Sequence, residues 1–79
     1  KEKKEIIGDF VDNSLLTGRE KEIASLLLNG RTYKMIAEEL YLSENTVKTH
    51  IKNIYSKLNI QSKSELIKLM LENGYGESK

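Results

Sequence analysis

The sequence contains no cysteine, proline or tryptophan, and its only histidine is His50. The lack of cysteine excludes a disulfide framework, a thiolate zinc site and a cysteine nucleophile. Apolar runs such as Leu26-Leu27-Leu28 are too short for a membrane span or a secretory signal. One histidine, without a glycine-rich phosphate loop or a base held by a third group, does not suit catalysis. We therefore expect no enzyme, no metal and no cofactor, and we place the chain in the cytoplasm without membrane contact.

The 79 residues are enough for one domain, and 38% hydrophobic with 32% charged residues is typical of a globular protein. A chain this short buries only about 60% of its unfolded surface, so a partner or a second copy could complete its core. Residues 1–13 are mostly charged and are interpreted as an N-terminal arm: a tether, a docking arm, a linker remnant or a partly disordered tail. Because the chain starts at Lys1 and not at Met, we expect a piece of a longer protein, with the main domain in residues 14–79.

The main domain has the pattern of four helices, expected near residues 17–29, 33–40, 44–58 and 63–73. Thr17 and Glu20 fit a capping box, in which two side chains reciprocally satisfy backbone donors, and Ser62 begins a second one. Gly30 can take the left-handed conformation that ends a helix. Apolar residues recur at helical spacing in each segment, which predicts an all-α fold similar to a four-helix bundle.

The third expected helix has two unlike faces when its residues are placed about 100° apart. One stripe is apolar and predicts burial, with Tyr55 assigned to packing: Val47, Ile51, Ile54, Tyr55 and Leu58. The opposite arc has short polar groups and cations but no acid: Asn45, Lys48, Thr49, Lys52 and Ser56. A short helix, a tight turn and a longer helix of this kind predict a helix-turn-helix motif, whose second helix fits the major groove of B-DNA.

The residue types on that arc suit base edges. Lys48 and Lys52 can donate to guanine O6 and N7. Thr49 can form a hydrogen bond or meet a thymine methyl group, and Asn45 can reach a base or a phosphate. Residues 31–63 carry a net charge of +3 and the rest of the chain −2, so the total of +1 conceals a basic middle. A basic patch is typical of a polyanion partner, although a merely solvated helix face would show the same lysines.

Four segments, in order and at matching spacing, resemble the LuxR-type (GerE/FixJ/NarL-like) DNA-binding domain of bacterial transcription regulators. They are 16–23 (LTGREKEI), 30–40 (GRTYKMIAEEL), 42–50 (LSENTVKTH) and 57–66 (KLNIQSKSEL). The resemblance covers about residues 15–71, which is most of the chain. It implies sequence-specific binding of double-stranded DNA in transcription regulation, by the C-terminal output domain of a response regulator or of a ligand-sensing regulator.

The resemblance also implies roles for single residues. Base contacts fall on Lys48, Thr49 and Lys52. Phosphate contacts fall on the following residues: Tyr33, Lys34, Thr46, His50 and Lys63. The family usually has arginine where Lys63 stands and often has glutamate where Met35 stands. These two departures weaken a bidentate phosphate contact at Lys63 and remove a salt bridge at Met35.

The fourth expected helix is apolar over about 200° of arc, although packing on one core needs only about 100°. Members of the LuxR family dimerise through this helix, which implies a homodimer interface that includes Ile67, Met70 and Leu71. Two-fold symmetry would match paired DNA half-sites about one helical turn apart. The alternative is that the N-terminal arm covers the surplus apolar surface.

Two further functions remain open from the sequence. One is a promoter-binding module similar to region 4 of a sigma factor, with RNA polymerase as its partner; association with core polymerase without dimerisation would favour it. The other is a helical protein-interaction module, which would show neither heparin retention nor a mobility shift with random DNA. The segment TVKTH and the apolar fourth helix argue against the sigma-factor interpretation.

Overall fold

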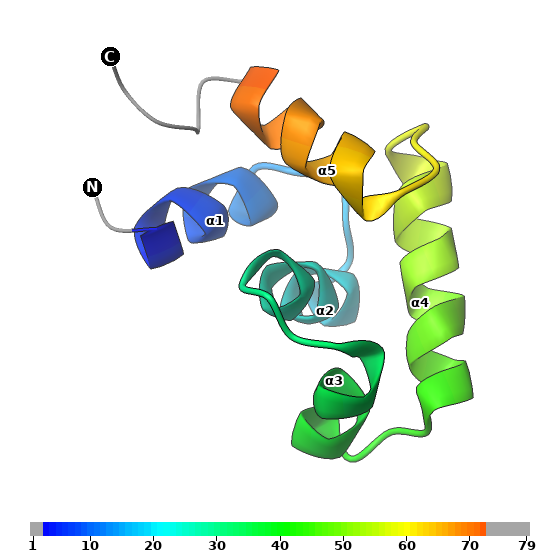
Figure 1. Cartoon of the computed structure of the whole chain (residues 1–79). Coiled ribbons are helices and arrows are strands. Elements are labelled where there is room, and N and C mark those ends of the chain that lie inside the picture. The colour runs from blue at the N-terminus through cyan, green and yellow to red at the C-terminus, as the bar shows by residue number, and fades with distance from the viewer. Residues whose placement is uncertain (1–2, 73–79) are drawn as a thin grey trace.

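The computed structural model describes residues 3–72, with side chains from residue 6 onward. This part of the chain is all-helical, as predicted, and contains these elements: α1 (Lys3–Asp12), α2 (Gly18–Leu28), α3 (Tyr33–Leu40), α4 (Glu44–Lys57) and α5 (Lys63–Met70). Figure 1 shows α4 along one side of the domain, with α5 crossing near its C-terminal end. The number of helices differs from the expected four, because part of the segment interpreted as an arm forms α1.

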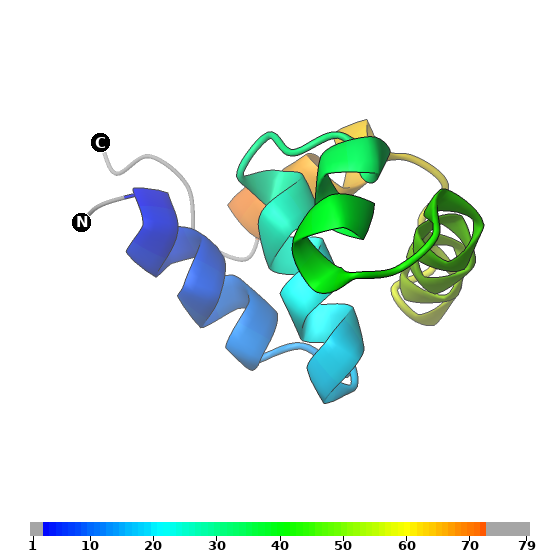
Figure 2. The same cartoon turned by 90° about the horizontal axis from the view of Figure 1, so that it is seen from below.

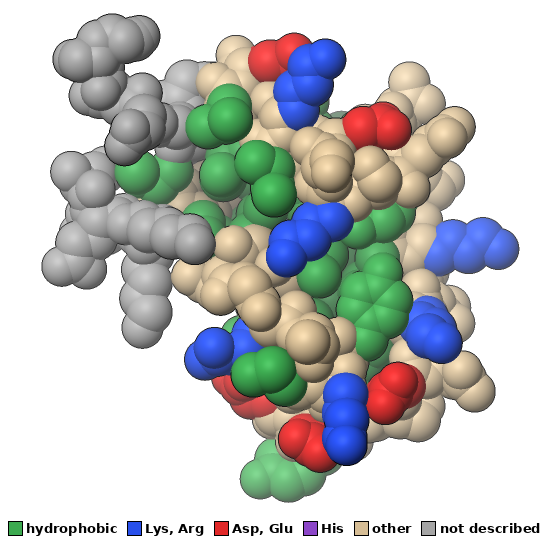
Figure 3. All heavy atoms as spheres, viewed as in Figure 1, with side chains coloured by type: hydrophobic (Ala, Val, Ile, Leu, Met, Phe, Trp, Pro, Cys, Tyr) green, Lys and Arg blue, Asp and Glu red, His purple; other side chains and the backbone are tan. Residues whose placement is uncertain are grey.

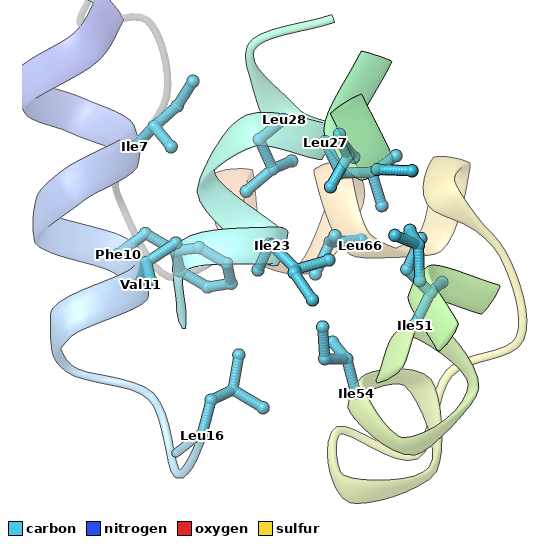
Figure 4. Packing of buried hydrophobic residues seen from close by; sticks show 14 residues of the cluster. Ile7, Phe10, Val11, Leu16, Ile23, Leu27, Leu28, Ile51, Ile54 and Leu66 are labelled. Atoms are coloured by element: carbon cyan, nitrogen blue, oxygen red, sulfur yellow. The ribbon is translucent and has the colours of Figure 1, made fainter. Parts of the chain in front are cut away.

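Helix α1 belongs to the folded core. Its residues Ile7, Phe10 and Val11 recur at helical spacing and are buried, and α1 packs mainly on α2. Figure 4 shows Phe10 and Val11 pointing toward Ile23 of α2, with Ile7 further along the side of α1 that faces α2. The described part of α1 therefore acts as a structural element of the domain.

The predicted start and end of α2 are confirmed. The Thr17 hydroxyl accepts a hydrogen bond from the Glu20 backbone N–H at 3.3 Å, and Glu20 Oε1 accepts one from the Thr17 N–H at 3.0 Å. These two bonds form the capping box. After α2, Gly30 adopts a φ of 90°, a region that favours glycine because it has no Cβ.

The turn between α3 and α4 contains no glycine, and a tyrosine takes the left-handed conformation instead. Tyr41 has φ 58° and ψ 43°, and its side chain is 94% exposed. The Leu42 N–H donates to the Ala37 carbonyl at 2.8 Å, which satisfies a carbonyl at the end of α3. Ser43 then caps α4, because its hydroxyl accepts from the Thr46 N–H at 3.1 Å.

One apolar cluster joins all five helices, and α4 contributes Val47, Ile51 and Ile54 to it. Tyr55 and Leu58, the other members of the predicted stripe, are half-buried against the same cluster. In Figure 2, where α4 is seen almost end-on, the helix lies at the edge of the domain with one side turned outward. The burial of one stripe of α4 thus fixes which face the helix presents to solvent.

A charged pair holds the end of α4 against the start of α2. Lys57 Nζ lies 2.8 Å from Glu20 Oε1, and the Glu20 side chain is only 7% exposed. The hydrogen bond from Lys57, followed by that from the Thr17 backbone, lowers the pKa of Glu20. Glu20 is therefore a buried carboxylate that remains ionised because of its partners.

Within residues 3–72, no helix combines the length and apolar character that crossing a lipid bilayer requires.

Candidate nucleic-acid interface

The outer face of α4 is the candidate interface, and its predicted residues are all exposed: Asn45, Lys48, Thr49, Lys52 and Ser56. They lie opposite the buried stripe of the same helix, so packing of that stripe holds them outward. The only acid of α4 is Glu44, in the first turn, where it interacts favourably with the positive end of the helix dipole. The rest of this face carries no negative charge, so it can approach a polyanion without electrostatic repulsion.

Local hydrogen bonds determine what two threonines can offer to a ligand. The Thr49 hydroxyl donates to the Asn45 carbonyl at 3.0 Å, so it presents its methyl group and an oxygen lone pair. The Ser43 hydroxyl donates to Thr46 Oγ1 at 2.9 Å, so the proton of the Thr46 hydroxyl is available to an outside acceptor. Thr49 is thus suited to a thymine methyl or a base amino group, and Thr46 to a phosphate oxygen.

Several basic side chains on other surfaces are already occupied by acids. Arg31 lies 3.5 Å from Glu39, Arg19 lies 3.2 Å from Glu22, and Lys57 pairs with Glu20. In contrast, Lys34, Lys48 and Lys52 form no ion pair with any side chain that the structure describes, and all three are exposed. Among the described side chains, the cations without an acidic partner thus include Lys34 at the start of α3 and Lys48 and Lys52 of α4.

The residues with implied phosphate contacts lie around α4. Tyr33 and Lys34 begin α3, Thr46 lies in the first turn of α4, and His50 is half-buried one turn later. Lys63 begins α5 and is half-buried near the C-terminal end of α4, at the opposite end from Thr46 (Figure 1). Because 14 helical residues span about 20 Å, Lys63 is separated from the other members of this group.

An open groove of about 480 Å³ follows one flank of α4. It brings Tyr33 of α3 together with the α4 residues Lys48 and Lys52, and it also involves Ile51, Tyr55 and Ile60. Burial raises the pKa of Tyr55 to about 12, and the charge and hydrogen bonding of Tyr33 add to this effect. From the sequence, Tyr55 is expected only to pack, and the groove is not expected, because it depends on how Tyr33 of α3 approaches α4.

The outer face of α5 keeps an apolar surface. Ile67 is 38% exposed and Leu71 is 50% exposed, whereas Met70 is half-buried against the core. Helix α1 contributes to the same core as Leu66, but it leaves Ile67 and Leu71 exposed. The structure therefore separates Met70, which packs internally, from the two residues available to a partner.

Within the described residues, no group of three or more His, Cys, Asp or Glu side chains is placed to hold a metal ion.

The family described as "Bacterial regulatory proteins, luxR family" matches residues 14–70. Spore germination protein GerE of Bacillus subtilis is 41% identical over 66 residues, which are 84% of this chain and 89% of that protein. Transcriptional regulatory protein DegU of Brevibacillus brevis is 39% identical over 61 residues, which are 77% of this chain and 26% of that protein. An uncharacterized response regulatory protein, YgeK of Escherichia coli, is 46% identical over 65 residues, which are 82% of this chain and 44% of that protein. No solved structure gives a significant match.

The family match extends from the capping box of α2 to the last turn of α5 and therefore includes the whole helix-turn-helix formed by α3 and α4. The family consists of DNA-binding transcription regulators and is not a class of enzymes. The sigma-factor alternative is not favoured by these findings. The chain belongs to the luxR family of bacterial regulatory proteins, and its function is DNA binding in transcription regulation.

Proposed function

We propose that α4 is the recognition helix and enters the major groove with Asn45, Lys48, Thr49 and Lys52 toward the base edges. The observation that carries this proposal is the exposed outer face of α4, whose two lysines have no acidic partner among the described side chains. A major groove about 12 Å wide admits one helix, and lysine, asparagine and threonine supply donors, acceptors and a methyl group for base readout.

Phosphate contacts would orient this helix and supply much of the affinity. Hydrogen-bond donors to the phosphates of one DNA strand would come from Tyr33 and Lys34 at the start of α3 and from Thr46 in the first turn of α4. Other points of the DNA backbone would be contacted by His50, on the side of α4, and by Lys63, beyond the C-terminal end of α4.

A homodimer through α5 would place two recognition helices on one operator. Ile67 and Leu71 are four residues apart, so they lie on one face of the helical segment, and both are substantially exposed. An isologous contact between two such faces would be two-fold symmetric and would predict half-sites about 34 Å apart, one turn of B-DNA. Sedimentation of Ile67→Lys against Lys68→Gln tests the contact: a monomer only in the Ile67 variant supports it, and equal dimerisation contradicts it.

The larger protein context is also a proposal. The chain spans most of GerE but only about a quarter of DegU and less than half of YgeK. Its role would be that of an output domain joined to a receiver or ligand-sensing domain, acting in the cytoplasm and contacting RNA polymerase at the promoter.

Selection of binding sites from a random duplex library tests the proposed mode of recognition. We expect enrichment of a motif with inverted half-sites spaced by about one helical turn. A library that shows binding but enriches no sequence would contradict base readout by α4. An enriched single half-site would contradict the symmetric dimer while leaving base readout intact.

A further inference from the structure

The groove beside α4 has the form of a small-molecule site. Its volume of about 480 Å³ lies within the range of about 300–1,000 Å³ that is typical of ligand pockets. Figure 3 shows an apolar surface between α3 and α4 with Lys and Arg side chains beside it. The groove is open along one side, so a ligand could enter without any change in the backbone.

The walls of the groove separate apolar from charged groups. Ile51 is buried and Tyr55 half-buried, and because they are one helical turn apart they form a continuous apolar floor. The Tyr33 ring, from α3, provides the facing wall. Lys48 and Lys52 are also one turn apart and form the outer edge. A ligand seated here would meet aromatic and aliphatic surface on one side and two ammonium groups on the other.

The charges favour an anion at that edge. Neither Lys48 nor Lys52 pairs with an acid among the described side chains, so both ammonium groups are available. Tyr55 adds no negative charge, because a tyrosine phenol is already neutral at physiological pH and burial raises its pKa further, to about 12. A flat ring fits against the tyrosines, since aromatic side chains prefer offset or edge contacts with other rings.

We propose that this groove binds a planar aromatic carboxylate, with its ring over Ile51 and Tyr55 and its carboxylate between Lys48 and Lys52. This inference rests on the proposed function for its consequence: the two lysines would then be withdrawn from base contacts, so the bound anion competes with DNA. The site is thus a place where a small acid lowers operator occupancy.

The probe for this proposal is 2-naphthoate, added to the full chain labelled with ¹⁵N. Amide NMR signals of Tyr33, Ile51, Tyr55 and Ile60 are expected to shift together and to saturate. The neutral analogue 2-naphthamide is expected to cause much smaller shifts at the same concentration. In a parallel titration, 2-naphthoate should weaken DNA binding several-fold more than acetate at equal ionic strength, because added salt alone also weakens it.

Gln61, at the end of the groove and outside the proposed DNA contacts, allows a matched pair of variants. Its side chain is exposed, and the hydrogen bond it makes to Glu65 comes from its backbone N–H, so substitution should not disturb the fold. Gln61→Trp is expected to fill the groove, abolish the naphthoate shifts and retain DNA binding, whereas Gln61→Ala should behave as the parent chain.

The possible outcomes separate the two proposals. Shifts that are absent, or spread evenly over the surface, would overturn the ligand site. Groove shifts with no more competition than acetate would overturn the link to DNA binding. Failure of the parent chain to bind any DNA would overturn the proposed function instead, and the NMR titration would still decide whether the groove binds the acid.

Discussion

Removal of the Lys57 ammonium group is expected to destabilise the domain more than removal of the Glu20 charge with which it pairs. The Glu20 side chain is 7% exposed and that of Lys57 is 41% exposed. In Lys57→Met the carboxylate stays buried with the Thr17 N–H as its remaining hydrogen-bond donor. Removing one partner of a buried ion pair lowers the free energy of unfolding by about 3–5 kcal/mol, because the other charge is left buried without its partner. The hydrogen bond from the Thr17 N–H compensates for part of this loss, so we expect Lys57→Met to cost about 2–3 kcal/mol.

Glu20→Gln should cost less, about 1 kcal/mol. The amide oxygen can still accept from the Thr17 N–H, and the Lys57 side chain is exposed enough to be hydrated when its partner is neutral. Lys57→Met is therefore expected to lose more stability than Glu20→Gln, because Glu20 is the buried member of the pair.

The contribution of Glu20 to the pH dependence of stability should differ in sign between the parent and Lys57→Met. The hydrogen bond from Lys57 lowers the folded-state pKa of Glu20, so its stabilisation is complete above the unfolded pKa and is lost as pH falls through the folded pKa. In Lys57→Met, burial without the cation should raise the pKa of Glu20. Protonation then relieves the buried charge, so the stability gap between the variant and the parent should narrow as pH falls.

Thermal unfolding followed by circular dichroism at about pH 7 and about pH 4 measures both effects. A loss of 2–3 kcal/mol corresponds to a decrease in Tm of roughly 10–20 °C for a domain of this size. Lys68→Met, at an exposed position of α5, is the matched control and should change Tm little. The reasoning is refuted if Lys57→Met is no less stable than this control, or if its deficit relative to the parent grows in acid.

Three other substitutions test separate parts of the structure. Phe10→Ala should lower the free energy of unfolding by about 3–4 kcal/mol in urea titrations, because Phe10 is buried in the core; a loss below about 1 kcal/mol would mean that α1 is not part of the cooperative unit. Tyr41→Gly should raise stability by about 1 kcal/mol in the same assay, since it removes a Cβ from a left-handed residue whose ring is 94% exposed; destabilisation would contradict this account of the turn. Lys34→Ala should weaken binding to all DNA sequences alike and reduce the slope of log affinity against log salt by about 1, and an unchanged slope would exclude its phosphate contact.

The helices of the main domain could be predicted because their signals are local. Thr17 and Ser43 cap the helices that follow them, and the expected range of 33–40 coincides with α3. The expected end of the last helix, at residue 73, lies outside the described residues. Helix α1 was not predicted, because charged neighbours and Gly8 dilute its pattern, and tertiary burial of Ile7, Phe10 and Val11 stabilises it.

The candidate site could be predicted only in part, for a physical reason. Helical periodicity fixes which residues share the outer face of α4, so Lys48 and Lys52 were expected to be exposed together, and they are. The groove depends on how Tyr33 of α3 approaches Tyr55 of α4, and no local pattern contains that distance. The left-handed Tyr41 was equally hidden, since the turn is closed by hydrogen bonds and not by the usual glycine.

The affinity of Lys52→Ala for the selected operator and for single-base variants of it tests the central claim most directly. We expect a loss of about 1–3 kcal/mol on the operator and a relaxed preference at one base pair, because the removed ammonium group donates to a base edge. Lys68→Ala, which removes an exposed lysine of α5, should keep both the affinity and the preference. A Lys52→Ala variant that binds every sequence as the parent does would contradict recognition by the outer face of α4.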